Sequence, residues 1–469
     1  MKKYLLISIS FLIALNLTSQ NKTLIKPKID KRVELLSIAF RLADADEYNS
    51  KAFKKYTNSI ETHFNAYKNH DLIKYIKKIR EENNIGYDAV MFMAIHISNP
   101  PELKPLVTFD DGIPEKRWNK EISIKFLKLL RAFYIDTNFE NFFEANKLTY
   151  TTSSERFMGV YDMLDINWYE AFYDEKPNGS YHIINGIGNG VGNYGGKVVY
   201  PDRTDRYSII GVWSTDSLGM PKYSIREHFP LLVHEINHSF INHLTEASKE
   251  NLEFSGQKIF NRVEEPMNNQ AYGNWQTMIN ESLVRASVLK YIQDHDFGER
   301  EFNGLLINEV NNGFLWTEAL VNELNRYDKN RDKFPTLKSF IPEIEKFFKS
   351  VAKNIDEIKS SIENKKPKVI KMSPFKNGNK NVDSEIKEIK FTFDKPLIGK
   401  GYSYIKGDKG KDAMPNVINV KYSENRKAVI FKVKLIPNKV YQFKLMGAAF
   451  KSVEGYGMDI YEVNFKTKS

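Results

Sequence analysis

The sequence contains no cysteine among its 469 residues. A chain without cysteine forms no disulfide and cannot carry the lipid of a lipoprotein anchor, so its stability must come from hydrophobic cores and, where present, a metal. Any zinc site must then be built from His, Asp and Glu side chains, because no thiolate can serve as a ligand.

Long apolar runs are also missing beyond the first twenty residues. Those residues, MKKYLLISISFLIALNLTSQ, begin with two lysines, are apolar from Tyr4 to about Leu17, and end in small and polar side chains. This is the pattern of a secretory signal peptide, and Asn16 leaves the run shorter than the roughly 20 apolar residues of a membrane-spanning helix. We expect residues 1–20 to be removed and the mature chain to be secreted or periplasmic, with no stable membrane anchor.

Charge of one sign is only modestly in excess. Lys plus Arg number 69 and Asp plus Glu number 59, which gives a net charge of +10 at pH 7. The lysines are scattered or lie in the C-terminal third, and no nucleic-acid-binding module accompanies them, so we expect a solvated surface and no nucleic-acid partner. Hydrophobic residues make up 41% of the chain, which argues against disorder. A length of 469 residues predicts roughly two to four domains.

The spacing of apolar residues changes along the chain. Helical spacing recurs to about residue 150, as in residues 31–78 and 122–143, which predicts a mainly helical beginning. The glycine-rich stretch YHIINGIGNGVGNYGGKVVY and the strand-like Tyr207–Trp213 follow it. Helical spacing then returns over residues 228–244, 274–292, 313–324 and 341–362. We expect one α+β domain over residues 21–363.

A different pattern begins after a lysine-rich linker, Asn364–Lys368. Apolar and polar residues alternate in steps of two over residues 386–396, 416–422, 427–434 and 439–446, as in a β-sandwich. The motifs Ser373-Pro374, Asn377-Gly378 and Phe391–Pro396 resemble the bacterial immunoglobulin-like (Ig-like) domains of exported enzymes. The resemblance implies an all-β Ig-like sandwich over residues 366–469 that acts as a spacer or binds a surface polymer.

Two histidines frame the segment His234-Glu235-Ile236-Asn237-His238. On a helix, residues four apart are about 40° apart in rotation and one turn along, so both imidazoles can reach one ion. Glu235 lies beside that face, where its carboxylate can take a proton from a zinc-bound water without binding the metal itself. The flanking residues are apolar, as expected of a buried active-site helix; a chance match on an ordinary amphipathic helix is the alternative.

The third ligand has more than one candidate. His243 lies nine residues from His234, a rotation of about 900° that puts it on the opposite helix face, and no glycine breaks the helix between them. The segment resembles gluzincin zinc peptidases, in which a glutamate on a later helix completes the site. This resemblance implies Glu281, with Arg285 one turn on to pair with it; a surface glutamate paired with Arg285 is the alternative.

The order of segments also resembles a bacterial family known as domain of unknown function 4932. The matching parts are KRVELLSIAFRLA, the glycine-rich NGVGNYGG, HEINHSFINH and NESLVRA. This resemblance implies zinc ligands at His234, His238 and Glu281, and it supplies no substrate.

The glycine-rich stretch contains a formal GxGxxG at Gly190–Gly195. A dinucleotide fingerprint opens a helix, whereas Lys197–Tyr200 reads as strand or loop, so we reject nucleotide binding. A glycine-rich edge near a cleft would let an extended peptide pair with the backbone, and a plain hairpin is the alternative.

Stabilising the oxyanion of a tetrahedral intermediate requires a hydrogen-bond donor opposite the metal. Tyr272, Tyr194 and His228 are the candidates. Tyr272 has a slight edge because it lies between the two predicted helices, and a packing role is the alternative.

Together these features predict an exported zinc metallopeptidase in which zinc-bound water attacks a peptide carbonyl, with Glu235 as base and then acid. The predicted fold class is α+β, a zincin-like catalytic domain followed by the Ig-like sandwich. The alternative function is a non-catalytic exported binding protein with a structural or vestigial metal site. A structural zinc normally has four protein ligands, whereas a catalytic zinc has three and keeps one position for water. The proposed site has three ligands, and Glu235 is present without being one of them, so the sequence favours catalysis.

Overall fold

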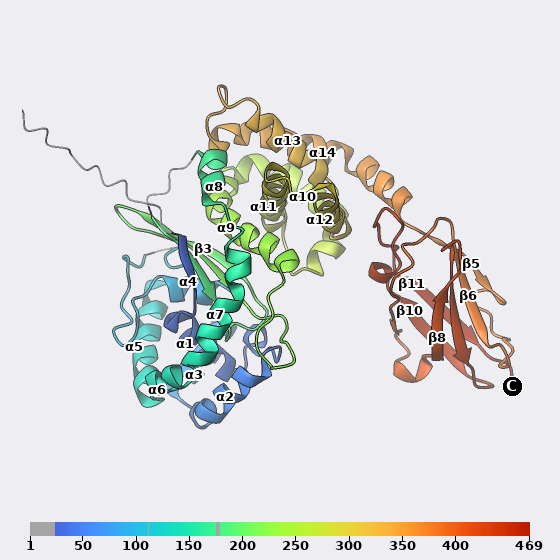
Figure 1. The fold of residues 1–469 in the computed structure, drawn as a ribbon, viewed down its shortest axis with the longest axis horizontal. Coiled ribbons are helices and arrows are strands. Elements are labelled where there is room, and N and C mark those ends of the chain that lie inside the picture. The colour runs from blue at the N-terminus through green and yellow to red at the C-terminus, as the bar shows by residue number, and fades with distance from the viewer. Residues whose placement is uncertain (1–23, 111, 175–178) are drawn as a thin grey trace, which may run out of the picture. The chain divides into compact units, whose positions relative to one another are not determined.

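The computed structural model describes residues 24–110, 112–174 and 179–469 (Figure 1). The chain divides into two compact units, residues 1–240 and 241–469. The predicted signal peptide, residues 1–20, lies outside the described residues. Within the described part of the chain, no helix has the length and apolar character needed to cross a bilayer.

The first unit is mainly helical up to its glycine-rich segment, as predicted. Its helices are α1 (Lys31–Leu42), α2 (Lys54–Phe64), α3 (Asp71–Asn83), α4 (Asp88–Ile95), α5 (Lys120–Asp136), α6 (Phe139–Ala145), α7 (Lys147–Tyr161) and α8 (Ile166–Tyr173), with the 3-10 turns η1 (Asp46–Tyr48) and η2 (Asn65–Tyr67). Helix α1 is buried over every residue from Arg32 to Leu42, as expected of a helix packed on all sides. It therefore lies at the centre of the core of this unit.

A mixed sheet completes the first unit. Its strands are β1 (Leu24–Lys28), β2 (Tyr181–Asn185), β3 (Tyr194–Val199) and β4 (Thr204–Ile210), in the order β1-β2-β4-β3. The first three strands of that order run parallel, and β3 pairs antiparallel with β4. Among the described residues β4 is the only strand paired with β3, so β3 is an edge strand.

The segment Gly190–Gly195 leads into strand β3, as the sequence predicts, and not into the helix that a dinucleotide fingerprint would open. A Cβ atom added at Gly195 would lie 2.1 Å from the backbone oxygen of Glu235, and one added at Gly196 would lie 3.1 Å from Ile95. Glycine is therefore required for the close approach of this strand to the backbone at Glu235. That residue belongs to α9 (Ile225–Ala247).

The second unit begins with a group of packed helices. They are α10 (Lys249–Asn268), α11 (Trp275–Asp294), α12 (Glu299–Asn311), α13 (Thr317–Asp328) and α14 (Leu337–Lys365). Helix α11 contacts α10, α12 and α13, and most of its residues from Met278 to Ile292 are buried, so it is the central helix of the group (Figure 1). The predicted helix at residues 274–292 is confirmed.

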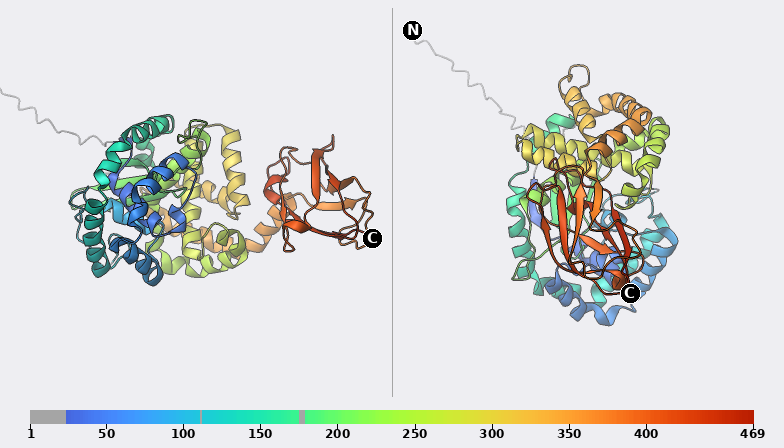
Figure 2. Two further views of the ribbon diagram at one scale, coloured as in Figure 1. Left: turned by 90° about the horizontal axis from the view of Figure 1, so that it is seen from below. Right: turned by 90° about the vertical axis from the view of Figure 1, so that its right-hand side faces the viewer.

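The rest of the second unit is all-β. Its strands are β5 (Val369–Ser373), β6 (Glu388–Phe393), β7 (Tyr404–Lys406), β8 (Asn416–Tyr422), β9 (Ala428–Lys434), β10 (Val440–Leu445) and β11 (Tyr461–Lys466), with the 3-10 turns η3 (Lys411–Ala413) and η4 (Gly447–Ala449). They form two antiparallel sheets, β5-β6-β9-β8 and β11-β10-β7. Figure 2 shows these strands in the orange and red part of the ribbon. Phe391 and Phe431 from one sheet and Phe443 from the other share one core. The α+β class and the C-terminal antiparallel sheets are confirmed, while the domain boundary at residues 363–366 stays a prediction.

Candidate metal centre

His234 and His238 lie on α9, one helical turn apart, as their spacing predicts. Their Nε2 atoms are 3.1 Å apart, and the planes of the two rings are inclined at 83°. Two nitrogens bound to one tetrahedral zinc would be separated by roughly 3.3 Å, given a Zn–N distance of about 2.05 Å. The pair therefore has the separation that a shared zinc ion requires.

Helix α9 is fixed by contacts on the side of Asn237. The hydroxyl of Tyr173 donates a 2.9 Å hydrogen bond to Oδ1 of Asn237, which is fully buried. The ring of Tyr173 stacks on Phe240 at 4.5 Å, and the guanidinium of Arg206 lies 4.4 Å from the Phe240 ring. These contacts hold the rotation of the helix that carries both histidines. The sequence did not identify Tyr173, because nothing in its local pattern distinguishes it from other packing tyrosines.

Glu281 lies on α11 and is buried, with 7% of its surface exposed. Its Oε2 accepts a 3.1 Å hydrogen bond from the hydroxyl of Tyr272 and lies 3.3 Å from Nε of Arg285. Arg285 also donates to the Tyr272 hydroxyl at 2.9 Å and to Glu309 at 2.5 Å. The predicted pairing of Glu281 with Arg285 is present, but it occurs in a buried network and not at the surface.

The contacts with Glu281 determine the protonation of its two partners, Arg285 and Tyr272. Burial opposes the charge on Arg285, but the carboxylates of Glu309 and Glu281 outweigh it and raise the pKa of the guanidinium. Burial, with the nearby Glu281 charge, raises the pKa of the Tyr272 hydroxyl well above its ordinary value. At neutral pH the phenol is therefore a neutral donor, and it and the guanidinium fix the orientation of the Glu281 carboxylate as partners of a metal ligand do.

Ligand atoms of His234, His238 and Glu281 all lie within 4.8 Å of one another. Two imidazole nitrogens and one carboxylate oxygen form a donor set typical of catalytic zinc. At the far end of α9, Asn280, the neighbour of Glu281, donates a 2.8 Å hydrogen bond to Thr245. The residues present thus fit a zinc ion.

Glu235 is buried, with 5% of its surface exposed, and it is outside this group of three. Its backbone oxygen faces Gly195 on the edge strand β3. The position leaves Glu235 next to the ligands without making it one of them.

The other residues considered as a ligand or an oxyanion donor are outside the group of three ligands. His243 is exposed and is outside the group. Nδ1 of His228 lies 3.1 Å from both N and O of Ser224, and burial lowers the pKa of this imidazole. Tyr194 begins strand β3, and burial, together with the charges of Glu47, Asp88 and Glu235, raises the pKa of its hydroxyl.

Comparisons with known proteins give a family but no activity. Residues 25–347 match the family model described as domain of unknown function (DUF4932). No curated protein matches the chain.

The solved structures that match include the N-terminal part of the bacterial S-layer protein SbsC, with 17% identity, a TM-score of 0.17, and coverage of 55% of this chain and 60% of that one. Domains 1–6 of the surface layer protein SbsC match with 11% identity, a TM-score of 0.18, and coverage of 85% and 46%. The chain thus spans between about half and three fifths of those proteins. At such TM-scores, the likeness carries no argument about fold or function.

Proposed function

The chain belongs to the DUF4932 family, whose description names no activity, and we propose that it is an exported zinc-dependent peptidase. The observation that carries this proposal is the group of His234, His238 and Glu281, with Glu235 buried beside it. Three protein ligands of this type are characteristic of a catalytic zinc, which keeps one position for water or substrate.

A zinc ion held by these side chains would polarise a peptide carbonyl and lower the pKa of water towards about 7. Glu235 is the proposed general base that accepts the proton of the attacking water and then delivers it to the leaving amine. Its burial keeps the carboxylate away from bulk solvent, and it is outside the group of three ligands, as a general base must be.

The proposed substrate is a peptide or protein in an extended conformation. Strand β3 is an edge strand and touches the backbone of Glu235 through Gly195. The outer side of an edge strand is where an extended peptide can add as a further strand through N–H and C=O groups. The helix of the two histidines, packed against an antiparallel edge strand, also supports the zincin-like class that we propose for this domain.

For the oxyanion donor we retain Tyr272, whose neutral hydroxyl donates its one proton to Glu281 in this structure and would turn that proton to the oxyanion in the transition state. Arg285 donates to the same oxygen, which makes the phenol a stronger donor. Tyr194 is the second candidate, since it lies on the strand that contacts Glu235.

The rival proposal is a non-catalytic exported binding protein with a structural metal. The C-terminal sheets, which we propose to be Ig-like, would then recognise a surface polymer as their main role. A structural zinc takes four protein ligands, whereas the group here supplies three among the described residues, which favours catalysis.

The test is digestion of a peptide library by the mature protein before and after metal removal. We expect cleavage that a chelator abolishes and that one equivalent of zinc restores, with one zinc per chain by elemental analysis. Cleavage that survives complete metal removal would contradict the proposal, as would a zinc-loaded protein that cleaves no peptide in the library.

A further inference from the structure

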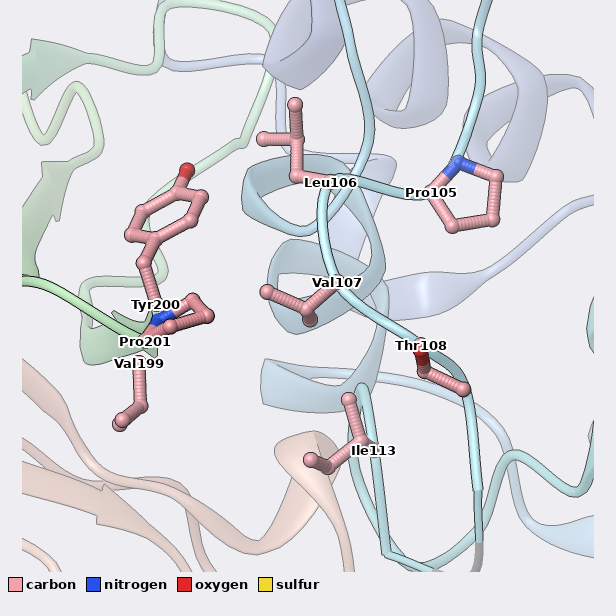
Figure 3. A pocket seen from close by; sticks show the side chains of 8 residues that line it. All are labelled: Pro105, Leu106, Val107, Thr108, Ile113, Val199, Tyr200 and Pro201. Atoms are coloured by element: carbon pink, nitrogen blue, oxygen red, sulfur yellow. The ribbon is translucent and has the colours of Figure 1, made fainter.

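A separate apolar pocket lies at the end of strand β3. Its volume is about 780 Å³, and it is lined by Pro105, Leu106, Val107, Thr108, Ile113, Val199, Tyr200 and Pro201. Figure 3 shows the side chains of Leu106 and Val107 on one side and those of Val199, Tyr200 and Pro201 on the other. All of the lining side chains except those of Thr108 and Tyr200, which each carry a hydroxyl, are hydrocarbon, so the pocket suits an apolar group.

Both walls of the pocket are held by the backbone. The amide of Leu106 donates a 2.8 Å hydrogen bond to the carbonyl of His96, and Pro105 forms a β-bridge with Ile97. On the other side, the amide of Tyr200 donates to the carbonyl of Arg203 at 2.8 Å. The side chains of Val107, Ile113 and Tyr200 pack on the core of the first unit. The pocket is therefore formed before any ligand arrives.

The pocket is also open to solvent. Val199 is 58% exposed, although it is a valine at the end of a strand. Covering its side chain and those of the facing loop would remove apolar surface from water, which stabilises a bound apolar group.

The register of β3 links this pocket to the candidate metal centre. Side chains alternate along a strand, so Val199 leaves the sheet on the same face as Gly195, the face that meets Glu235. Val198, on the other face, is fully buried. Val199 lies four residues beyond Gly195 on the strand. The pocket is therefore about 13 Å along β3 from the contact with Glu235, at the usual rise of an extended strand.

We propose that this pocket binds an apolar side chain of an extended peptide substrate, about four residues from the bond that is cut. The inference rests on the proposed peptidase function and adds a specificity that the metal centre alone does not provide. A peptide that follows the outer edge of β3 advances at the same rise per residue as the strand, so its side chain at that distance arrives at the pocket.

The experiment scans Leu, Ser and Asp through decapeptides at the third, fourth and fifth positions on each side of the cleaved bond. At one such position the wild-type protein should cleave the Leu peptide about tenfold faster than the Asp peptide, since burial of one apolar side chain is worth that much. Val199→Asp should abolish this preference, because it places a charge among the apolar side chains of the pocket. The matched control is Leu148→Asp, because Leu148 is 80% exposed on α7 and outside the pocket.

Fluorescence anisotropy with the Glu235→Gln protein provides a second measurement, independent of cleavage. Labelled Leu decapeptides should bind about tenfold more tightly than Asp decapeptides, and Val199→Asp should remove the difference. An absent preference at every scanned position, or a preference that Val199→Asp leaves intact, would overturn the inference. If binding shows the preference but wild type and Glu235→Gln cleave equally, the peptidase mechanism fails while the pocket assignment stands.

Discussion

Glu235→Gln is expected to keep one zinc per chain and to lose at least about 100-fold in kcat on any peptide that the wild type cleaves. The substitution keeps the size and packing of a buried side chain but removes the group that accepts the proton. Because Glu235 is not among His234, His238 and Glu281, metal binding should be unchanged. Zinc content by elemental analysis and steady-state kinetics on the same samples measure both quantities.

The matched control for this change is Glu246→Gln, an exposed glutamate near the end of the same helix. It should leave kcat and zinc content at their wild-type values. Equal kcat for wild type and Glu235→Gln would eliminate the proposed base, and loss of zinc in Glu235→Gln would make this glutamate a ligand.

The second large effect concerns the third ligand. Glu281→Gln should weaken zinc binding by more than about 100-fold, because loss of a partner that merely orients a ligand already costs roughly 10–100-fold. His243→Ala should leave the affinity unchanged, since His243 is exposed and outside the ligand group. Competition with a chromophoric chelator measures both affinities.

Unfolding of the metal-free proteins separates ligand loss from a damaged fold. Glu281→Gln should still unfold cooperatively, because Arg285 keeps its ion pair with Glu309. Strong weakening in His243→Ala with an unaffected Glu281→Gln would reverse the assignment of the third ligand.

Local spacing was enough to predict several features correctly. The i, i+4 histidines lie on one face of the helix, one turn apart, and their ring nitrogens meet there at 3.1 Å. Strand β8 has the bounds of one predicted alternating segment, Asn416–Tyr422, since side chains alternate between the two faces of a strand.

Other features depend on contacts between distant parts of the chain, which one sequence does not reveal. Strand β1, LIKPK, is short and lysine-rich, and it exists because it pairs in parallel with β2 more than 150 residues later. Glu34 lies on a helix with clear apolar spacing, yet it is fully buried and accepts hydrogen bonds from Tyr56 and Gly188. Burial of this carboxyl group raises its pKa to about 7.

In the candidate site, too, local spacing predicted some contacts, while others depend on distant parts of the chain. The sequence suggested that Arg285 could pair with Glu281, because the two are one helical turn apart. The partner that completes the network, Glu309, lies on α12 and carries no motif. The hydroxyl of Tyr272, one of three candidate oxyanion donors in the sequence, contacts Glu281 and Arg285, which the sequence did not predict.

The central claim is that His234, His238 and Glu281 hold one zinc ion with a position left for water or substrate. Anomalous diffraction at the zinc absorption edge from crystals of the full mature chain tests it most directly. We expect a single strong peak at bonding distance, about 2.0–2.2 Å, from one atom of each of these three side chains, with no fourth protein ligand. A zinc peak elsewhere, or a fourth side chain that closes the site, would contradict it.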